Sequence, residues 1–352
     1  MESVPQRDRD LETLVRRRAE AALGAEIAGI EPIAGQLGLR RFFRVTLASG
    51  PVATLIARVD RPEDPAGRPA GVPPEPPLEP VRALLERHGL PVPARHGGDP
   101  EGGIDLLEDL GDRTLRGAAA EASPADRSAL YEEACDLVPR LQAIDDPGDD
   151  LPAFQRRLDD ALFAYKADLF ATWAVGRLGG EAGAAARACI RAAFDTAARA
   201  AARAPQRLAH RDLQSANLHL VSGRGLVMID LQGAFLAPPE YDLVCLLRDS
   251  YVELTDGEVE RHLDRVRLRL PEAPGADEFA RRFDLLTITR KGKDLARFLY
   301  AAAARGDERY LPYVPGTLRM LRAAAERAAI RDPHLRDFAD LCRGLREAPC
   351  AR

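Results

Sequence analysis

The run from His210 to Tyr251 constrains the fold of this chain more than any other stretch. It reads H-R-D-L-Q-S-A-N-L-H-L, then a turn that contains glycine, then V-M-I-D-L-Q-G-A, and it ends in P-P-E-Y-D-L-V-C-L-L-R-D-S-Y. Short apolar strands are predicted on both sides of the turn, over 218–221 and 226–230, and a helix is predicted from Tyr241. A polar loop, a hairpin and a supporting helix therefore follow one another, and the rest of the chain has to supply the body that holds them.

The rest of the chain divides into a β-rich part and a helical part. An amphipathic helix over 9–22 is followed by three predicted strands, over 26–33, 40–47 and 52–59. A helix over 78–88, an edge strand at P-V-P-A-R and a buried strand in G-G-I-D-L-L-E-D-L complete this part. Long helices rich in Ala, Leu and Arg are then predicted over 123–144, 154–178 and 182–203. We therefore expect an α+β protein of two lobes, a small β-rich lobe at 1–110 and a large helical lobe at 111–352.

Charge and hydrophobicity exclude some classes of partner. The net charge of −5 gives no general attraction to nucleic acid or to an anionic membrane. No window holds the roughly 18 uncharged apolar residues of a membrane-spanning helix, and the polar N-terminus lacks the apolar core of a signal peptide. These features predict a cytoplasmic protein, which we expect to be a monomer with small-molecule ligands.

The spacing of polar residues within the run suits phosphoryl transfer. His210, Asp212 and Asn217 form H-x-D-x-x-x-x-N in a loop, and Asp230 follows 13 residues after Asn217 at the end of an apolar strand. In such a reaction one carboxylate orients and deprotonates the attacking hydroxyl, while an amide and a second carboxylate hold Mg²⁺ on nucleotide phosphates. Hard oxygen ligands without clustered Cys or His favour Mg²⁺ over Zn²⁺. The alternative makes the aspartates loop caps and His210 a core histidine.

The run, and the order of the elements around it, resemble the aminoglycoside phosphotransferase-like kinases, a small-molecule branch of the protein-kinase fold. This resemblance covers most of the chain and implies a two-lobed, protein-kinase-like fold with ATP and Mg²⁺ in the cleft. It implies that Asp212 is the catalytic base, that Asn217 and Asp230 bind Mg²⁺, and that His210 supports the catalytic loop.

The same resemblance assigns the nucleotide site to the small lobe. Backbone between Glu108 and Leu110, in L-L-E-D-L-G, would meet the adenine ring. Gly35 and Gly38 would let backbone amides approach a phosphate closely, although an ordinary hairpin turn explains these two glycines as well. Glu79 stands where the family has a glutamate that pairs with a lysine on the third strand.

That lysine is missing from this chain. Lysine occurs only at Lys166, Lys291 and Lys293, so the small lobe contains none. Arg58, in T-L-I-A-R-V, is the nearest substitute, and the alternative is a solvated charge at the end of a strand. A guanidinium is a fork-shaped donor rather than a point charge, so the exchange is not neutral. The glycine-containing loop also lacks a hydroxyl, which leaves backbone amides with Arg40 or Arg41 to meet the phosphates.

Several motifs are more similar to one subfamily, the anomeric sugar kinases of cell-wall recycling that phosphorylate N-acetylmuramate and N-acetylglucosamine. These motifs are R-R-F-F-R (40–44), L-L-E-D-L-G-D, I-D-L-Q-G-A, A-P-P-E-Y-D-L-V-C-L-L-R-D-S-Y and, later, T-R-K-G-K-D-L-A-R-F-L (289–299). The chain differs from the subfamily at Leu231, Gly233 and Lys291–Gly292, and in a longer insertion at 61–77 with seven prolines. These departures leave the acceptor hydroxyl open.

Residues of the large lobe are candidates for contact with the acceptor. Arg290, Lys293 and Arg297 share one face of a predicted helix because they are spaced by three and four residues. This cationic face would bind an acidic sugar such as N-acetylmuramate, or the donor phosphate, unless it is only a solvated basic face. Asp249 would contact a hydroxyl, and Trp173 would stack on a sugar or lie in the core.

Two other functions remain open from the sequence. The chain could phosphorylate another acceptor, such as an aminoglycoside, choline or a thiamine-type alcohol, although a cationic acceptor calls for an acidic site. It could also be a pseudokinase that binds nucleotide as a scaffold, because the third-strand lysine is missing. The complete set of His210, Asp212, Asn217 and Asp230 argues against the scaffold.

Overall fold

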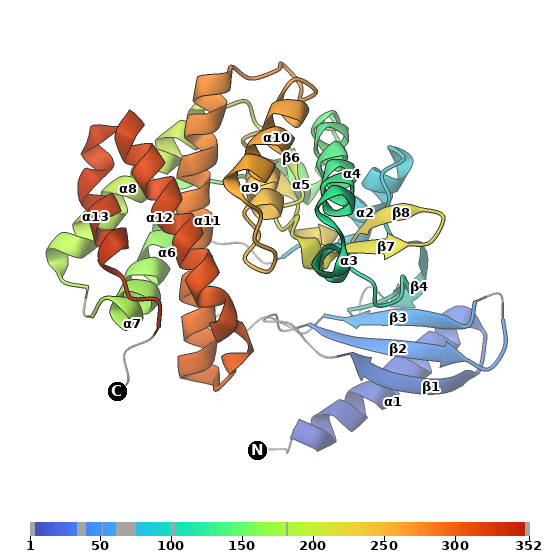
Figure 1. Cartoon of the computed structure of the whole chain (residues 1–352). Helices are drawn as coiled ribbons and strands as arrows, with labels where there is room; N and C mark the ends of the chain where they lie inside the picture. The colour runs from blue at the N-terminus through green and yellow to red at the C-terminus, as the bar shows by residue number, and fades with distance from the viewer. Residues whose placement is uncertain are drawn as a thin grey trace.

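The first part of the chain folds into a five-stranded antiparallel sheet with a helix packed on one face (Figure 1). The computed structural model describes residues 4–33, 40–50, 52–60, 75–99, 103–180 and 182–348. The strands are β1 (Ile27–Ile33), β2 (Arg41–Leu47), β3 (Thr54–Val59), β4 (Arg95–Asp99) and β5 (Ile104–Glu108), in the order β1-β2-β3-β5-β4. The three strands predicted first and the buried strand after them are confirmed.

Helix α1 (Val4–Leu23) closes the open face of this sheet. Its Val15 and Ala19 are fully buried, in one apolar cluster with side chains that alternate along β2 and β3, such as Phe43, Val45 and Ala57. That alternation is the pattern of a sheet with one buried face. Helix α2 (Leu78–Arg87) has its buried leucines in the other, larger cluster, with the helical part of the chain.

The edge strand begins later than the sequence predicts. Proline lacks the backbone N–H that a ladder needs, and β4 starts only at Arg95, beyond Pro91 and Pro93. Glu108 marks the end of β5, and the chain then enters the helical part. We propose the boundary between the lobes at residue 110, between β5 and the next helix.

The helical part is built around one long central helix, α11 (Ala276–Arg305), which contacts helices from both earlier and later in the chain (Figure 1). The helices before it are α3 (Leu115–Glu121), α4 (Pro124–Gln142), α5 (Pro152–Gln155), α6 (Asp160–Leu169), a π-helical stretch Phe170–Val175, α7 (Gly176–Leu178), α8 (Ala184–Arg203), α9 (Tyr241–Leu247) and α10 (Asp256–Arg267). A 3-10 stretch Glu308–Tyr313, α12 (Val314–Arg331) and α13 (Arg336–Gly344) follow it. None of the helices in the described ranges is both long and apolar enough to cross a membrane.

The helix predicted over 154–178 is wrong in its first part. Arg156 has extended backbone, and Arg157 forms an isolated bridge with Leu236. The helical periodicity of the sequence continues through this interruption, because the side chains on both sides of it are buried in the same core. The break therefore arises from pairing with a distant segment, which local pattern does not record.

Two small two-stranded sheets carry the run that opens at His210. Strands β6 (Arg207–Ala209) and β9 (Phe235–Ala237) pair with each other, as do β7 (Leu218–Val221) and β8 (Gly225–Met228). The catalytic loop predicted from the sequence lies between β6 and β7, and the loop with Asp230 lies between β8 and β9. Two antiparallel pairs thus hold both polar loops by their ends.

Candidate active site

The loop after β6 is fixed by a buried carboxylate of α9. Asp242 accepts hydrogen bonds from the backbone N–H of His210 at 2.7 Å and of Arg211 at 3.0 Å. Arg211 has a φ of 79°, a left-handed conformation that costs free energy in a residue other than glycine. Both oxygens of Asp242 thus stabilise a bend that the local sequence would not favour.

His210 joins the two polar loops. Its Nε2 lies 2.9 Å from the carbonyl oxygen of Ile229, and its Nδ1 lies 3.3 Å from the backbone N–H of Asp212. Nδ1 accepts from that N–H, so Nε2 carries the proton and donates to Ile229. Because the ring is 2% exposed, His210 holds the loops together and is not open to a substrate.

Asp212 lies at the tip of the loop beside a buried arginine of α11. Its Oδ1 accepts from Arg290 at 2.5 Å, and Arg290 also donates to the backbone carbonyl of Arg211 at 3.3 Å. Burial alone would raise the pKa of Asp212, but Arg290 and Lys293 lower it below its usual value. The carboxylate therefore stays ionised, and its side chain is 35% exposed while that of Arg290 is 6% exposed. A charged, oriented and accessible oxygen is what a general base requires.

Asn217 and Asp230 offer oxygen atoms from the two loops. The Nδ2 of Asn217 donates to the backbone carbonyl of Asp212 at 2.9 Å, and the backbone N–H of Ile229 donates to the carbonyl of Asn217 at 3.0 Å. Asp230 has a φ of 63°, and its Oδ1 accepts from Gln232 at 2.7 Å. Within the described ranges no three acidic, histidine or cysteine side chains group to hold a metal by themselves. One carboxylate and one amide fit Mg²⁺ when nucleotide phosphates and water supply the other ligands.

A chain of charged groups links the small lobe to Asp230. Arg40 lies 3.0 Å from the Oδ1 of Asp230 and 3.2 Å from the Oδ1 of Asp60, and it also pairs with Glu75. Arg58 joins the same chain through Asp60, at 2.7 Å. The sequence left Arg40 as one of two candidate phosphate contacts, and its link to Asp230 became visible only in three dimensions. Gly35, Gly38 and most of the insertion at 61–77 lie outside the described residues.

Arg58 is not a solvated charge. It is 3% exposed, burial lowers the pKa of its guanidinium, and it pairs with Asp105 of β5 at 2.9 Å as well as with Asp60. The expected pairing with Glu79 is wrong for the described side chains, because Glu79 binds Arg82 at 2.7 Å and lies 3.7 Å from Arg95. Neighbouring cations on α2 and β4 thus neutralise Glu79, and aspartates on the strands neutralise Arg58.

The segment after β5 is fastened on both sides. The N–H of Glu108 donates to the carbonyl of Ala94 at 2.8 Å, and its carboxylate binds Arg224 at 2.8 Å. Arg44, from the R-R-F-F-R motif, binds Asp109 at 2.8 Å. The backbone of Leu110 has no partner among the described residues. The side chain of Glu108 therefore has a structural task, and Leu110 is the better candidate for contact with an adenine ring.

Asp249 does not reach an acceptor, which corrects the prediction from the sequence. It is 1% exposed, and its Oδ2 accepts from the backbone N–H and the hydroxyl of Ser215, at 2.8 and 2.5 Å. Its Oδ1 accepts from the backbone N–H of Tyr251 at 3.0 Å. Because both of its carboxylate oxygens accept hydrogen bonds from the protein, Asp249 anchors the loop that follows β6.

The basic face of α11 is largely neutralised within the chain. Lys291 is buried and binds both Ser250 and Asp294 at 2.8 Å. Lys293 lies 3.4 Å from Asp294, and burial together with Arg290 lowers its pKa to about 8. Asp294, which the sequence did not single out, thus forms ion pairs with the cations on its side of the helix. Lys293 remains partly open, and Arg297 is exposed.

Two further residues lie around this face, the predicted stacking residue Trp173 and a buried lysine. Trp173 lies against Tyr300 of α11, with ring centroids 4.9 Å apart, so it packs edge to face on a partly exposed aromatic neighbour. Lys166, which the sequence did not single out, is 5% exposed, and its Nζ has no hydrogen-bond partner among the described residues. Burial, and to a lesser extent the positive charge of Lys293, lowers the pKa of Lys166 to about 7.

Comparison with known proteins agrees with this arrangement. A model of the phosphotransferase enzyme family matches residues 29–279. The chain is 29% identical over 275 residues to the N-acetylmuramate/N-acetylglucosamine kinase of Pseudomonas aeruginosa, which covers 76% of this chain and 78% of that protein. It is 29% identical over 303 residues to the protein of the same name in Neisseria meningitidis, over 84% of this chain and 85% of that protein.

A solved structure shows the same fold. The choline kinase of Streptococcus pneumoniae superposes with a TM-score of 0.59 at 15% identity, over 91% of this chain and 99% of that chain. This confirms the two-lobed, protein-kinase-like α+β fold expected from the sequence. The chain belongs to the phosphotransferase enzyme family, as an ATP-dependent small-molecule kinase.

Proposed function

We propose that this chain transfers the γ-phosphoryl group of ATP to the anomeric hydroxyl of an amino sugar, N-acetylmuramate or N-acetylglucosamine. The observation that carries the reaction type is the carboxylate of Asp212, ionised, 35% exposed and held at 2.5 Å by Arg290. The similarity to N-acetylmuramate/N-acetylglucosamine kinases over most of the chain supports the acceptor.

Asp212 acts as the catalytic base in this proposal. Its carboxylate accepts the proton of the acceptor hydroxyl, the hydroxyl oxygen forms a bond to the γ-phosphorus, and the bond to the bridging oxygen of ADP breaks. Arg290 positions the carboxylate and keeps it ionised. Lys293, beside Arg290 and partly open, meets the charge of the transferring phosphoryl group.

The donor side uses the chain of charges in the small lobe. Asn217 and Asp230 would hold Mg²⁺, which neutralises the nucleotide phosphates when bound. Arg40 supplies the cationic contact for which relatives of this fold use a lysine, with backbone amides near Gly35 and Gly38, and the buried Arg58 supports Arg40 through their shared partner Asp60. Leu110 offers backbone groups to the adenine ring.

The charge of the site favours a neutral or acidic acceptor over a cationic one. On the helical side of Asp212, Lys293 is partly open and Arg297 is exposed, so a choline or an aminoglycoside would meet repulsion there. Arg290 and Lys293 together lower the pKa of Asp212, so the local field is positive even beside the base. An amino sugar, uncharged or carrying a carboxylate, suits this field.

An ATP-consumption assay tests the proposal. The chain is incubated with Mg-ATP and N-acetylmuramate, N-acetylglucosamine, simple hexoses, an aminoglycoside or choline. We expect turnover with the two amino sugars, and a loss of about 10²–10⁴-fold in kcat for Asp212→Asn, with nucleotide binding retained. Near wild-type turnover by that variant would overturn the base assignment, and a preference for choline or an aminoglycoside would overturn the acceptor.

A further inference from the structure

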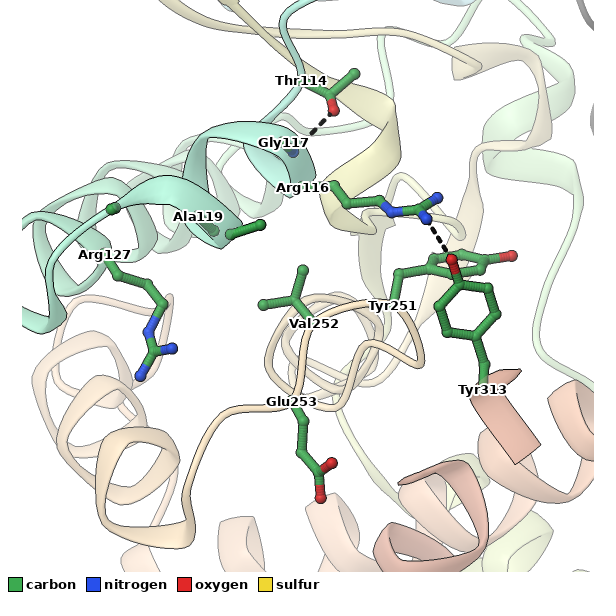
Figure 2. A pocket seen from close by; sticks show the side chains of 11 residues that line it. Thr114, Arg116, Gly117, Ala119, Arg127, Tyr251, Val252, Glu253 and Tyr313 are labelled. Atoms are coloured by element: carbon green, nitrogen blue, oxygen red, sulfur yellow. Dashed lines mark hydrogen bonds between the residues drawn. The ribbon is translucent and has the colours of Figure 1, made fainter. Parts of the chain in front are cut away.

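A cavity of about 570 Å³ opens beside the catalytic loop, between α3 and the segment that follows α9 (Figure 2). Its walls are formed by Arg116 and Ala119 of α3, by Arg127 of α4, and by Val252, Glu253 and the two rings of Tyr251 and Tyr313. Asp212, Asn217 and Asp230 are not among its lining residues. A volume of this size is within the range of small-molecule sites.

Tyr251 connects this cavity to the reacting centre. Its backbone N–H donates to Asp249, the residue that anchors Ser215 of the catalytic loop. Its ring centroid lies 6.2 Å from that of Phe298, one helical turn beyond Asp294 on α11. A ligand in the cavity therefore touches a ring that also borders the cationic face beside Asp212.

The charges that line the cavity leave one cation without an acidic partner. Arg127 binds Glu258 at 2.5 Å, and Glu253 binds Arg319 at 2.7 Å. No described carboxylate pairs with Arg116. Its guanidinium instead lies 4.9 Å from the centroid of the Tyr251 ring and 5.3 Å from that of Tyr313, and it donates a hydrogen bond to the hydroxyl of Tyr313 (Figure 2).

This packing orients Arg116 in advance of binding. Two ring faces and one hydroxyl fix the guanidinium plane, so little side-chain entropy is lost when an anion binds it. A guanidinium presents parallel N–H groups that match the two oxygens of a carboxylate. Ala119 and Val252 form an apolar wall that suits a short carbon chain between such a carboxylate and the rest of the ligand.

We propose that this cavity is the subsite for a carboxylate-bearing substituent of the acceptor, and that Arg116 binds the carboxylate. The inference rests on the proposed function, because it places the reacting hydroxyl at Asp212. It also assigns different roles to the cations of the site. Arg290 and Lys291 are held by Asp212 and Asp294, whereas Arg116 is left to the acceptor. Arg116 is then the residue that distinguishes acidic from neutral amino sugars.

Steady-state kinetics of Arg116→Met with two acceptors tests this subsite. We expect KM for N-acetylmuramate, which carries a carboxylate, to rise about 10-fold, a loss of about 1.4 kcal/mol in binding. We expect kcat for N-acetylmuramate to stay within about twofold of the wild-type value. Both kcat and KM for N-acetylglucosamine should be unchanged, because this sugar lacks the carboxylate-bearing substituent. Arg116→Lys should recover part of the loss, because it restores the charge without the fork.

Arg113→Met is the matched control, since Arg113 is exposed, precedes α3 and loses the same charge outside the cavity. The inference is overturned if Arg116→Met leaves both acceptors unchanged, or weakens both equally. Should the wild-type chain phosphorylate neither sugar, the proposed function fails. Calorimetric titration of N-acetylmuramate in the presence of Mg-ADP then decides the subsite, because weaker binding by Arg116→Met supports it and equal or absent binding refutes it.

Discussion

Replacement of Arg290 by methionine isolates the contact that holds Asp212, the proposed catalytic base. Arg290 is 5% exposed and donates to Asp212 at 2.5 Å, and methionine keeps much of its buried volume while removing the charge and the donors. Asp294 loses a neighbour at 3.4 Å but retains Lys291 and Lys293. The main change therefore falls on Asp212.

The size of the expected loss of stability depends on how far the Asp212–Arg290 pair is exposed to water. Two opposite charges about 4 Å apart interact by about 4 kcal/mol at the effective dielectric constant of a site near a protein surface. The Asp212 side chain is 35% exposed, and water screens part of this interaction. We therefore expect the free energy of unfolding at pH 7.5 to fall by about 1–3 kcal/mol, measured by urea denaturation.

The pH dependence gives a second measure with a defined sign. Arg290 and Lys293 lower the pKa of folded Asp212 despite its burial, so the carboxylate contributes stability above its unfolded pKa of about 3.9 and loses it as the pH falls through the folded pKa. Without Arg290 that pKa rises. The difference in unfolding free energy between the variant and the wild type should shrink below about pH 4. The acidic limb of kcat/KM should move to higher pH, because kcat/KM reports the free enzyme.

Arg343→Met is the control, because Arg343 binds Asp340 at 2.6 Å with both side chains more than 60% exposed. An exposed pair contributes at most about 1 kcal/mol, so stability and the pH profile should hardly change. If Arg290→Met has the same acidic limb as the wild type, Asp212 is not tuned by Arg290, and the electrostatic part of the proposed mechanism is wrong.

Two other buried charges give separate tests. Asp249→Asn should lower kcat by about 10–100-fold with little change in the KM for the acceptor, because it weakens the hydrogen bonds to Ser215 and Tyr251 without touching the acceptor. A large rise in KM with unchanged kcat would instead show that Asp249 contacts the acceptor. Lys166→Met should raise the free energy of unfolding at pH 7.5 by roughly 1–3 kcal/mol, because the lysine is buried without a hydrogen-bond partner among the described residues. Since its pKa is lowered to about 7, stability of the wild type should rise between about pH 7 and 10, and the variant should lose that rise in urea denaturation measured across this range.

The sequence predicted the parts of the site that depend on local spacing. His210, Asp212, Asn217 and Asp230 lie on two loops that short strands hold side by side, and strand patterns on either side of a glycine turn are readable from alternation alone. The sheet of the small lobe was predictable for the same reason, because buried apolar side chains recur at every second position over much of β2 and β3. Assignment of roles to the four residues stays a prediction that kinetics must test.

What the sequence could not supply was the choice of partners. Asp249, Glu79 and Arg58 each have a charge that suits a ligand, but Asp249 is hydrogen-bonded to Ser215, Glu79 pairs with Arg82 on its own helix, and Arg58 pairs with Asp105 on a neighbouring strand. A chain with 55 acidic and 50 basic side chains allows many such pairs, and only packing decides among them. The cavity at Arg116 was missed for a similar reason, since its walls come from separate segments and only Tyr251 among them ends a motif named above.

The contact between Arg40 and Asp230 gives the site a thermodynamic property. Asp230 already has a cation from its own chain, so the Mg²⁺ ligation proposed above would exchange one cation for another. The guanidinium of Arg40 would then be free to meet the nucleotide phosphates, and the affinity for the metal nucleotide would contain the cost of breaking this internal link. We therefore expect any change that weakens the ion pairs of Arg40 with Asp60 or Glu75 to alter metal affinity without touching a proposed metal ligand.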